Sequence, residues 1–153
     1  GSEPSGPTEP ERPRAPPPSP QEMALRLTAL PAPYNTADLE NGRRAFARCR
    51  SCHTITDGGP NMTGPNLYGV FGRTSGTAER YNYSAALREA NFAWDAARLD
   101  HWLQNPRGFL PGNKMTFPGL EDANDRRDII AFIEVQVAPA TTPASPANAG
   151  EAE

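Results

Sequence analysis

The sequence predicts an all-α fold with about four to five helices and long loops, flanked by disordered Pro-rich tails. Three observations lead to this prediction. Ten of the 18 prolines lie in residues 1–33 and three lie after Ala138, so only five fall in residues 34–137. Apolar residues in that central part recur at helical spacing, and no segment alternates as a half-buried strand does. We therefore predict one domain at 34–137.

Both tails have compositions typical of disorder. Residues 1–20 are mainly Pro, Glu, Ser and Arg, which offer too little apolar surface to offset the entropy of folding. We expect residues 1–33 to form a disordered tether and 138–153 a disordered C-terminal tail. Four apolar side chains interrupt the tether at 21–30. Two interpretations stay open for them: a short helix or strand lying on the domain, or an apolar stretch of linker.

The first and last helices of the domain are indicated by apolar spacing. Asn35 or Thr36 can cap the first helix. Its inward positions are three or four residues apart: Leu39, Gly42, Phe46 and Cys49. The last helix runs from about residue 122 or 124 to Val137. It has a broad apolar stripe made of Ile129, Ile130, Phe132, Ile133 and Val137.

Two shorter helices are expected between them. One follows Ser84 and turns Leu87 inward. The other starts near Asp95, carries Leu99, Trp102 and Leu103 on one side, and ends at Asn105, because Pro106 disfavours a helical residue before it.

The loops are long for so small a domain. Residues 57–76 are rich in glycine, and residues 107–119 are rich in turn-forming residues. Four helices and two such loops make a thin core in about a hundred residues. Long irregular loops inside a compact domain usually have a functional or stabilising reason. We therefore expect a further group to fill the centre.

Charge and hydropathy exclude some classes of function. The formal net charge is -3, and residues 34–137 contain twelve acidic and twelve basic side chains, whereas nucleic-acid-binding domains are usually basic. The longest apolar run, Ile129–Ile133, is far shorter than the ~18 residues of a membrane-spanning candidate. Gly1 and Ser2 resemble a cloning scar. We expect a membrane connection only through an N-terminal segment that has been removed.

The most specific motif is C-x-x-C-H at residues 49–53, which contains both cysteines of the chain and His53. This pattern is typical of c-type haem attachment, in which Cys49 and Cys52 bind the haem covalently and His53 ligates the iron. The alternatives fit less well. A disulfide would close a very short loop, a thioredoxin-like pair needs a βαβ context, and a zinc site needs two further ligands.

Residue spacing alone leaves the sixth iron position open. Met115 lies in a loop rich in proline and glycine that can hold a side chain inward. Met62, Met23, His101 and an open position are the alternatives, since a lone methionine is often only core filling.

Several further motifs carry a resemblance. They are residues 64–73 (GPNLYGVFGR), Tyr81 to Ser84, Trp94, Asn105-Pro106, Pro111-Gly112, Lys114-Met115, Phe117 and residues 129–133. With C-x-x-C-H, they show that the sequence from Leu39 to about Val135 resembles class I c-type cytochromes, both mitochondrial cytochrome c and alphaproteobacterial relatives. The resemblance implies the cytochrome c fold, wrapped around one covalently bound haem.

The resemblance also implies roles for individual residues. Met115 would be the second axial ligand, so that the iron has no open position and the function is electron transfer, not catalysis. The Pro65 carbonyl would accept the His53 Nδ1–H. The remaining cofactor-binding residues would hold the propionates or cover the haem edge: Arg73, Tyr83, Trp94 and Phe117. Trp102 is a departure, because many relatives have a tyrosine that reaches the methionine sulfur.

The implied partners are redox proteins bound transiently by charge. Four cations would surround the exposed haem edge: Arg48, Arg50, Arg107 and Lys114. We expect a monomeric carrier that takes electrons from a quinol-oxidising cytochrome bc complex to a terminal oxidase in the bacterial periplasm, tethered to the outer face of the cytoplasmic membrane. The alternatives are the electron-entry domain of a larger enzyme, or a haem peroxidase or gas sensor with a labile methionine ligand.

Overall fold

The computed structural model describes residues 14–77, 81 and 83–137, and within them the protein is helical. The elements in chain order are α1 (Pro20–Thr28), the 3-10 helix η1 (Tyr34–Thr36), α2 (Leu39–Arg50), α3 (Ala85–Ala90), α4 (Ala96–Gln104), α5 (Pro106–Phe109) and α6 (Ala123–Val137). The described residues form no strand beyond one isolated bridge between Thr74 and Ala93. The all-α prediction is confirmed.

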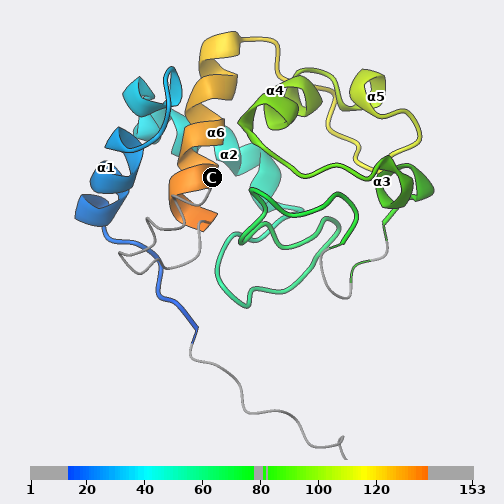
Figure 1. The fold of residues 1–153 in the computed structure, drawn as a ribbon, viewed down its shortest axis with the longest axis horizontal. Coiled ribbons are helices and arrows are strands. Elements are labelled where there is room, and N and C mark those ends of the chain that lie inside the picture. Colours follow the sequence, from blue (N-terminus) through cyan, green and yellow to red (C-terminus); the bar gives the residue numbers. More distant parts are fainter. Residues whose placement is uncertain (1–13, 78–80, 82, 138–153) are drawn as a thin grey trace, which may run out of the picture.

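The centre of the fold is the crossing of α2 and α6, with α1 on one side of α6 and α3, α4 and α5 on the other (Figure 1). Gly42 allows the close approach. A Cβ added there would lie 2.2 Å from the Asp128 carbonyl oxygen. Phe46 is fully buried and its ring centroid lies 5.7 Å from that of Phe132. The first predicted helix of the domain therefore packs closely on the last.

The cap of α2 differs from the prediction. Asp38, not Asn35 or Thr36, caps the helix by accepting the Asn41 N–H at 3.1 Å. Residues 34–36 instead form η1, which packs against α6. The segment before α2 is thus tied to the domain.

The two short central helices begin where their cap residues predicted. The Ser84 hydroxyl accepts the Leu87 N–H at the start of α3, and the Asp95 carboxylate accepts the Arg98 N–H at the start of α4. A further helix, α5, occupies part of the predicted loop 107–119. Asn105 caps α5 by accepting the Gly108 N–H at 3.0 Å, and Pro106 supplies its first residue.

Residues 14–33 correct the predicted extent of the tether. They include α1, which packs on α6 and η1. Arg26 donates from Nη1 to the Val135 carbonyl at 2.7 Å, and Gln136 donates to the Met23 sulfur at 3.1 Å. Ahead of α1, the Ala15 N–H donates to the buried Asp57 carboxylate at 2.8 Å. We call residues 14–33 the strap.

Of the two interpretations for residues 21–30, the helix lying on the domain is correct. Two other parts of the tail predictions, residues 1–13 and 138–153, lie outside the described residues. No helix in the described part of the chain is long and apolar enough to cross a bilayer.

Candidate functional site

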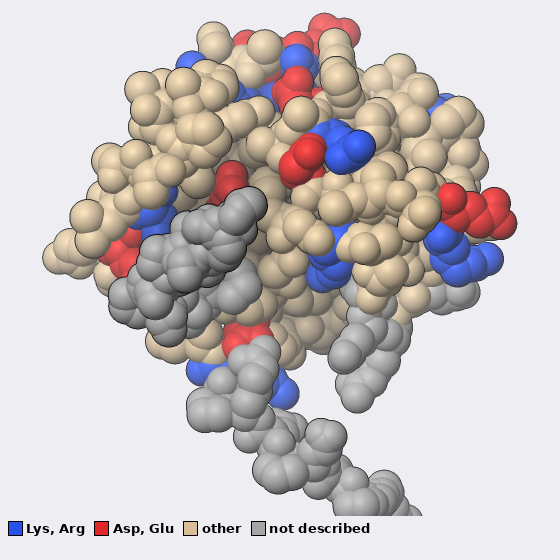
Figure 2. All heavy atoms as spheres, in the orientation of Figure 1, with Lys and Arg blue, Asp and Glu red and all other residues tan. Residues whose placement is uncertain are grey.

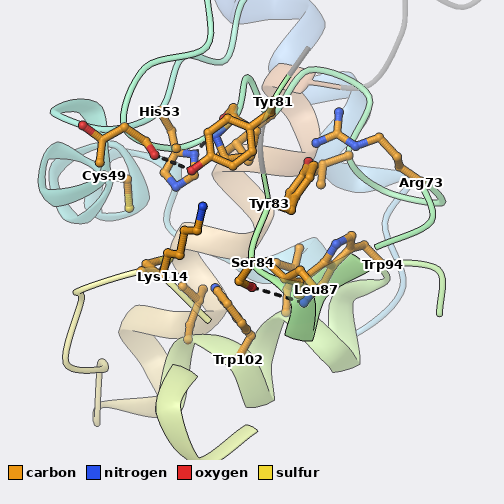
Figure 3. A pocket seen from close by; sticks show the side chains of 18 of the residues that line it. Cys49, His53, Arg73, Tyr81, Tyr83, Ser84, Leu87, Trp94, Trp102 and Lys114 are labelled. Atoms are coloured by element: carbon orange, nitrogen blue, oxygen red, sulfur yellow. Dashed lines mark hydrogen bonds between the residues drawn. The ribbon is translucent and has the colours of Figure 1, made fainter. Parts of the chain in front are cut away.

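A cavity of about 1030 Å³, including its open mouth, lies among α2, α4, α6 and the two long loops. Side chains from well-separated segments converge on it (Figure 3). The lining residues are Cys49, His53, Thr63, Gly64, Pro65, Leu67, Val70, Arg73, Tyr81, Tyr83, Ser84, Leu87, Trp94, Leu99, Trp102, Leu103, Lys114, Met115, Thr116 and Ile133.

The C-x-x-C-H segment forms one edge of this cavity, where α2 ends. The Cys52 and His53 N–H groups both donate to the Cys49 carbonyl, so the chain turns back on itself directly after the helix. Cys49 and His53 line the cavity, whereas Cys52 is half-buried beside it. No disulfide joins the two cysteines. Burial, with a smaller effect of Cys52, raises the pKa of Cys49 to about 11. A redox dithiol needs the opposite shift.

The His53 ring is held in one orientation. Its Nδ1 lies 2.8 Å from the Pro65 carbonyl oxygen, the contact that the resemblance implied. Because a carbonyl only accepts, Nδ1 carries the proton and Nε2 keeps its lone pair for a metal. Burial lowers the pKa of His53, although the bond to Pro65 opposes this shift. The neutral, ligating form of the imidazole is therefore favoured.

Gly64 makes room for that ring. A Cβ at residue 64 would lie 2.3 Å from His53 Cε1, closer than side chains approach one another. The Gly64 N–H donates to the Cys52 carbonyl at 2.7 Å, which fastens the glycine-rich loop to the C-x-x-C-H segment. The glycine and the proline that follow the motif thus position the imidazole together.

Met115 is the methionine that reaches the cavity. Of the three methionines, Met23 lies on α1 and Met62 is 45 % exposed; neither lines the cavity. His101 is also exposed and lies outside it. The structure therefore places one candidate for a second axial ligand in the same cavity as His53.

Polar groups gather on one side of the cavity, formed by Arg73, Tyr83 and Trp94 (Figure 3). The Arg73 guanidinium donates to the Asn66 carbonyl at 3.1 Å and also bonds the Tyr83 side chain. Burial lowers the pKa of Arg73, while Tyr83 raises it. A held guanidinium beside a phenol and an indole can bind the carboxylates of a ligand.

The rest of the wall is apolar and aromatic. Trp102 is 7 % exposed and packs edge-on against Trp94, with ring centroids 5.5 Å apart. Phe117 packs on the hydrophobic core but is not among the lining residues. Sequence reasoning did not assign several of the lining residues to the site. It had identified four of these only as inward apolar positions of helices: Leu87, Leu99, Leu103 and Ile133.

Tyr81 and Thr63 are lining residues that the sequence did not assign to the site. The Tyr81 hydroxyl donates to the Thr63 carbonyl and so joins two loops across the cavity edge. Tyr81 could have been found from its position two residues before Tyr83, which had been assigned to the site.

The donor set and the cavity fit haem c. Two thiols lie at one edge, a neutral imidazole and a thioether line the same largely apolar space, and a guanidinium lies beside a phenol on the polar side. The alternative of a zinc site has no support among the described residues, where no group of three or more His, Cys, Asp and Glu side chains lies together.

The four predicted docking cations are exposed. Arg48 and Arg50 belong to the last turn of α2, Arg107 belongs to α5, and Lys114 lines the cavity. Figure 2 shows cations and carboxylates intermixed over one face, with no broad region of a single sign. Any electrostatic docking must therefore come from the local arrangement of charges.

Comparisons with known proteins agree on one family. The family model described as Cytochrome c matches residues 39–136. Cytochrome c of Kluyveromyces lactis is 44% identical over 105 residues, covering 68% of this chain and 96% of that protein. A cytochrome c homolog of Bradyrhizobium diazoefficiens is 41% identical over 99 residues, covering 64% and 54%. The solved structure of cytochrome cH from Methylobacterium extorquens matches with a TM-score of 0.61 at 40% identity, covering 65% and 100%.

Proposed function

This chain belongs to the cytochrome c family and is a haem-based electron carrier, and we propose that His53 and Met115 ligate its iron while it carries electrons from a quinol-oxidising cytochrome bc complex to a terminal oxidase. One observation supports the ligand assignment above all others. His53, with its Nδ1 committed to Pro65, and Met115 line one cavity together with Cys49.

The haem c bound through Cys49 and Cys52 supplies one-electron iron chemistry. The protein residues determine how that chemistry is used. His53 and Met115 would occupy both axial positions, which leaves none for oxygen or peroxide, and a thioether opposite an imidazole raises the reduction potential. Arg73, Tyr83 and Trp94 would bind the propionates. The surrounding apolar wall, including Trp102, excludes water from the iron.

Docking on partners is supported by how the cations are paired. Most arginines outside the predicted docking set have a carboxylate partner: Arg43 and Arg44 bind Glu40, and Arg98 binds Asp95. In the described part of the chain, no carboxylate lies within ion-pair distance of Arg48, Arg50 or Arg107. Exposed cations that no carboxylate neutralises can attract an acidic surface and speed the encounter.

The docking proposal is tested by oxidation of the reduced protein by a terminal oxidase at several salt concentrations. The variant R48Q/R50Q/R107Q should react several-fold more slowly at low salt and depend less on ionic strength, because screening acts on exposed charges. Arg43→Gln is the matched control, since it removes an exposed cation that is already paired with Glu40. Equal salt dependence in the wild-type protein and the triple variant would refute the docking proposal.

We also propose that the protein works in the bacterial periplasm, tethered to the outer face of the cytoplasmic membrane. The strap shortens the tether that the sequence predicted, because residues 14–33 lie on the domain. A tether ahead of the strap would keep the domain close to membrane-bound partners and raise their effective concentration. Fractionation of cells producing the native gene product tests this, and recovery only in the soluble periplasmic fraction would overturn it.

A further inference from the structure

The loop between α5 and α6 carries Met115 (Figure 1). It turns sharply at Gly112, whose φ of 93° lies in the left-handed region that favours glycine. Met115 follows three residues later and reaches the cavity. A loop of this length needs ties to the helices if one of its side chains is to stay in place.

Asn113 supplies the tie nearest to Met115. Its Nδ2 donates to the Pro106 carbonyl at 2.9 Å and to the Leu110 carbonyl at 2.8 Å, and its Oδ1 accepts the Met115 N–H at 2.8 Å. The two carbonyls require donors and the N–H requires an acceptor, so only one orientation of the amide satisfies all three. One side chain therefore fastens the Met115 backbone to α5.

Asn113 fastens Met115 to α5, which packs on a helix that lines the cavity. Helix α5 packs on α4, and the cap residue between them, Asn105, binds the Gly108 N–H. Helix α4 supplies Trp102 and Leu103 to the cavity lining. Asn113 therefore connects Met115, through α5, to one helix of the cavity wall.

A second tie lies farther along the loop. The Leu120 N–H donates to the Leu103 carbonyl at 2.7 Å, and the buried Arg126 donates to the Leu120 and Glu121 carbonyls, each at 2.8 Å. Arg126 also bonds Asp100 at 2.7 Å. Five residues separate Leu120 from Met115, whereas Asn113 bonds the Met115 backbone directly.

We propose that Asn113 is a positioning residue that sets how firmly Met115 occupies the axial position. This inference rests on the proposed ligation by Met115. Without the Asn113 amide, the loop opens more readily and the sulfur leaves more often. A net hydrogen bond contributes ~1 kcal/mol, about fivefold in an equilibrium. Three hydrogen bonds are lost, but water can bond some of the groups left without partners. We therefore expect about a tenfold rise in the fraction of molecules in which the loop is open.

The test is binding of imidazole to the ferric, haem-loaded protein, measured by absorption spectroscopy. Imidazole competes with Met115 for the iron, so its affinity reports the open population. Asn113→Ala should bind imidazole about tenfold more tightly than the wild-type protein. Asn41→Ala is the matched control, because it removes two hydrogen bonds of the α2 and α6 crossing, to Asp125 and Asp128, and no hydrogen bond to Met115.

The outcomes separate the inference from the ligand assignment. If Asn113 had only a structural role, Asn113→Ala and Asn41→Ala would both be less stable than the wild-type protein but would bind imidazole with the same affinity as each other. That result would overturn the inference. Met115→Ala tests the assignment. If imidazole binds Met115→Ala no more tightly than the wild-type protein, Met115 is not the ligand.

The wild-type protein provides a second measurement that needs no variant. The Met115 amide should be protected from hydrogen exchange by Asn113 Oδ1, and this protection should be lost when imidazole saturates the iron, because the loop must open. Protection that persists in the imidazole complex would overturn the inference even if Asn113→Ala failed to fold.

Discussion

Replacing Gly42 with alanine should destabilise the domain, although alanine is the better helix former. The propensity gain is about 1 kcal/mol in favour of alanine. The new Cβ, however, would lie 2.2 Å from the Asp128 carbonyl oxygen and 2.8 Å from Phe132 Cβ. Both neighbours belong to α6, and a backbone oxygen cannot rotate away as a side chain can. Helices α2 and α6 must therefore separate.

Separation weakens the contacts that the crossing makes. Phe46 and Phe132 pack together there, and the Asp38 N–H donates to Asp128 Oδ1 at 2.9 Å. Overpacking typically costs ~1–3 kcal/mol, and we expect the upper part of that range, ~2–3 kcal/mol, because the clash is with backbone. After subtraction of the propensity gain, we expect a net loss of about 1–2 kcal/mol. The melting temperature should fall by about 4–16 °C, at ~4–8 °C per kcal/mol for a domain of this size.

The assay is guanidinium and thermal unfolding of the haem-loaded protein, followed by circular dichroism. Ala47→Gly, at an exposed position of the same helix, is the control, since it measures propensity alone and should cost about 1 kcal/mol. If Gly42→Ala were more stable than the wild-type protein by a similar amount, the close approach of α2 and α6 would not be a constraint.

Three further predictions concern stability. Arg26→Ala should lower the free energy of unfolding by about 1–2 kcal/mol, because the Val135 carbonyl loses a charged donor. Glu22→Ala removes only an exposed ion pair and should cost under ~1 kcal/mol. Equal losses would refute docking of the strap through Arg26. Burial raises the pKa of Glu134, so ionisation of this carboxyl opposes folding as the pH rises through that pKa. Glu134→Gln should therefore be more stable than the wild-type protein at pH 7 and equal to it below about pH 4. An equal gain in stability at both pH values would contradict this prediction. Burial alone would raise the pKa of Asp128, but hydrogen bonds from Arg127, the Asp38 N–H and Asn41 lower it. The contribution of Asp128 to stability is therefore present above about pH 4 and lost as the pH falls through the folded pKa. The stability of Asp128→Asn should depend less on acid pH than that of the wild-type protein.

Local patterns predicted the parts of the fold that depend on neighbouring residues. Ser84 and Asp95 begin α3 and α4, as capping side chains should. The spacing of the C-x-x-C-H motif located the His53 side of the cavity, whereas the bond from His53 to Pro65 was implied by the resemblance to class I c-type cytochromes. These predictions needed no knowledge of how distant segments pack.

The strap and Asn113 could not be predicted in this way. Arg26 and Val135 are 109 residues apart in the chain, and nothing in the local composition of residues 21–30 indicates that pairing. Asn113 occurs in a segment rich in turn-forming residues, where an asparagine is ordinary. Two of its three bonds go to carbonyls of α5 and its C-cap residue Leu110, and the sequence did not predict this four-residue helix.

The most direct test of the central claim is the absorption spectrum of the reduced protein before and after addition of carbon monoxide. Ligation by both His53 and Met115 leaves no open position on the iron, so the spectrum of the wild-type protein should not change. Met115→Ala should bind carbon monoxide and show the shift. A shift in the wild-type protein would contradict the account and favour a haem peroxidase or gas sensor.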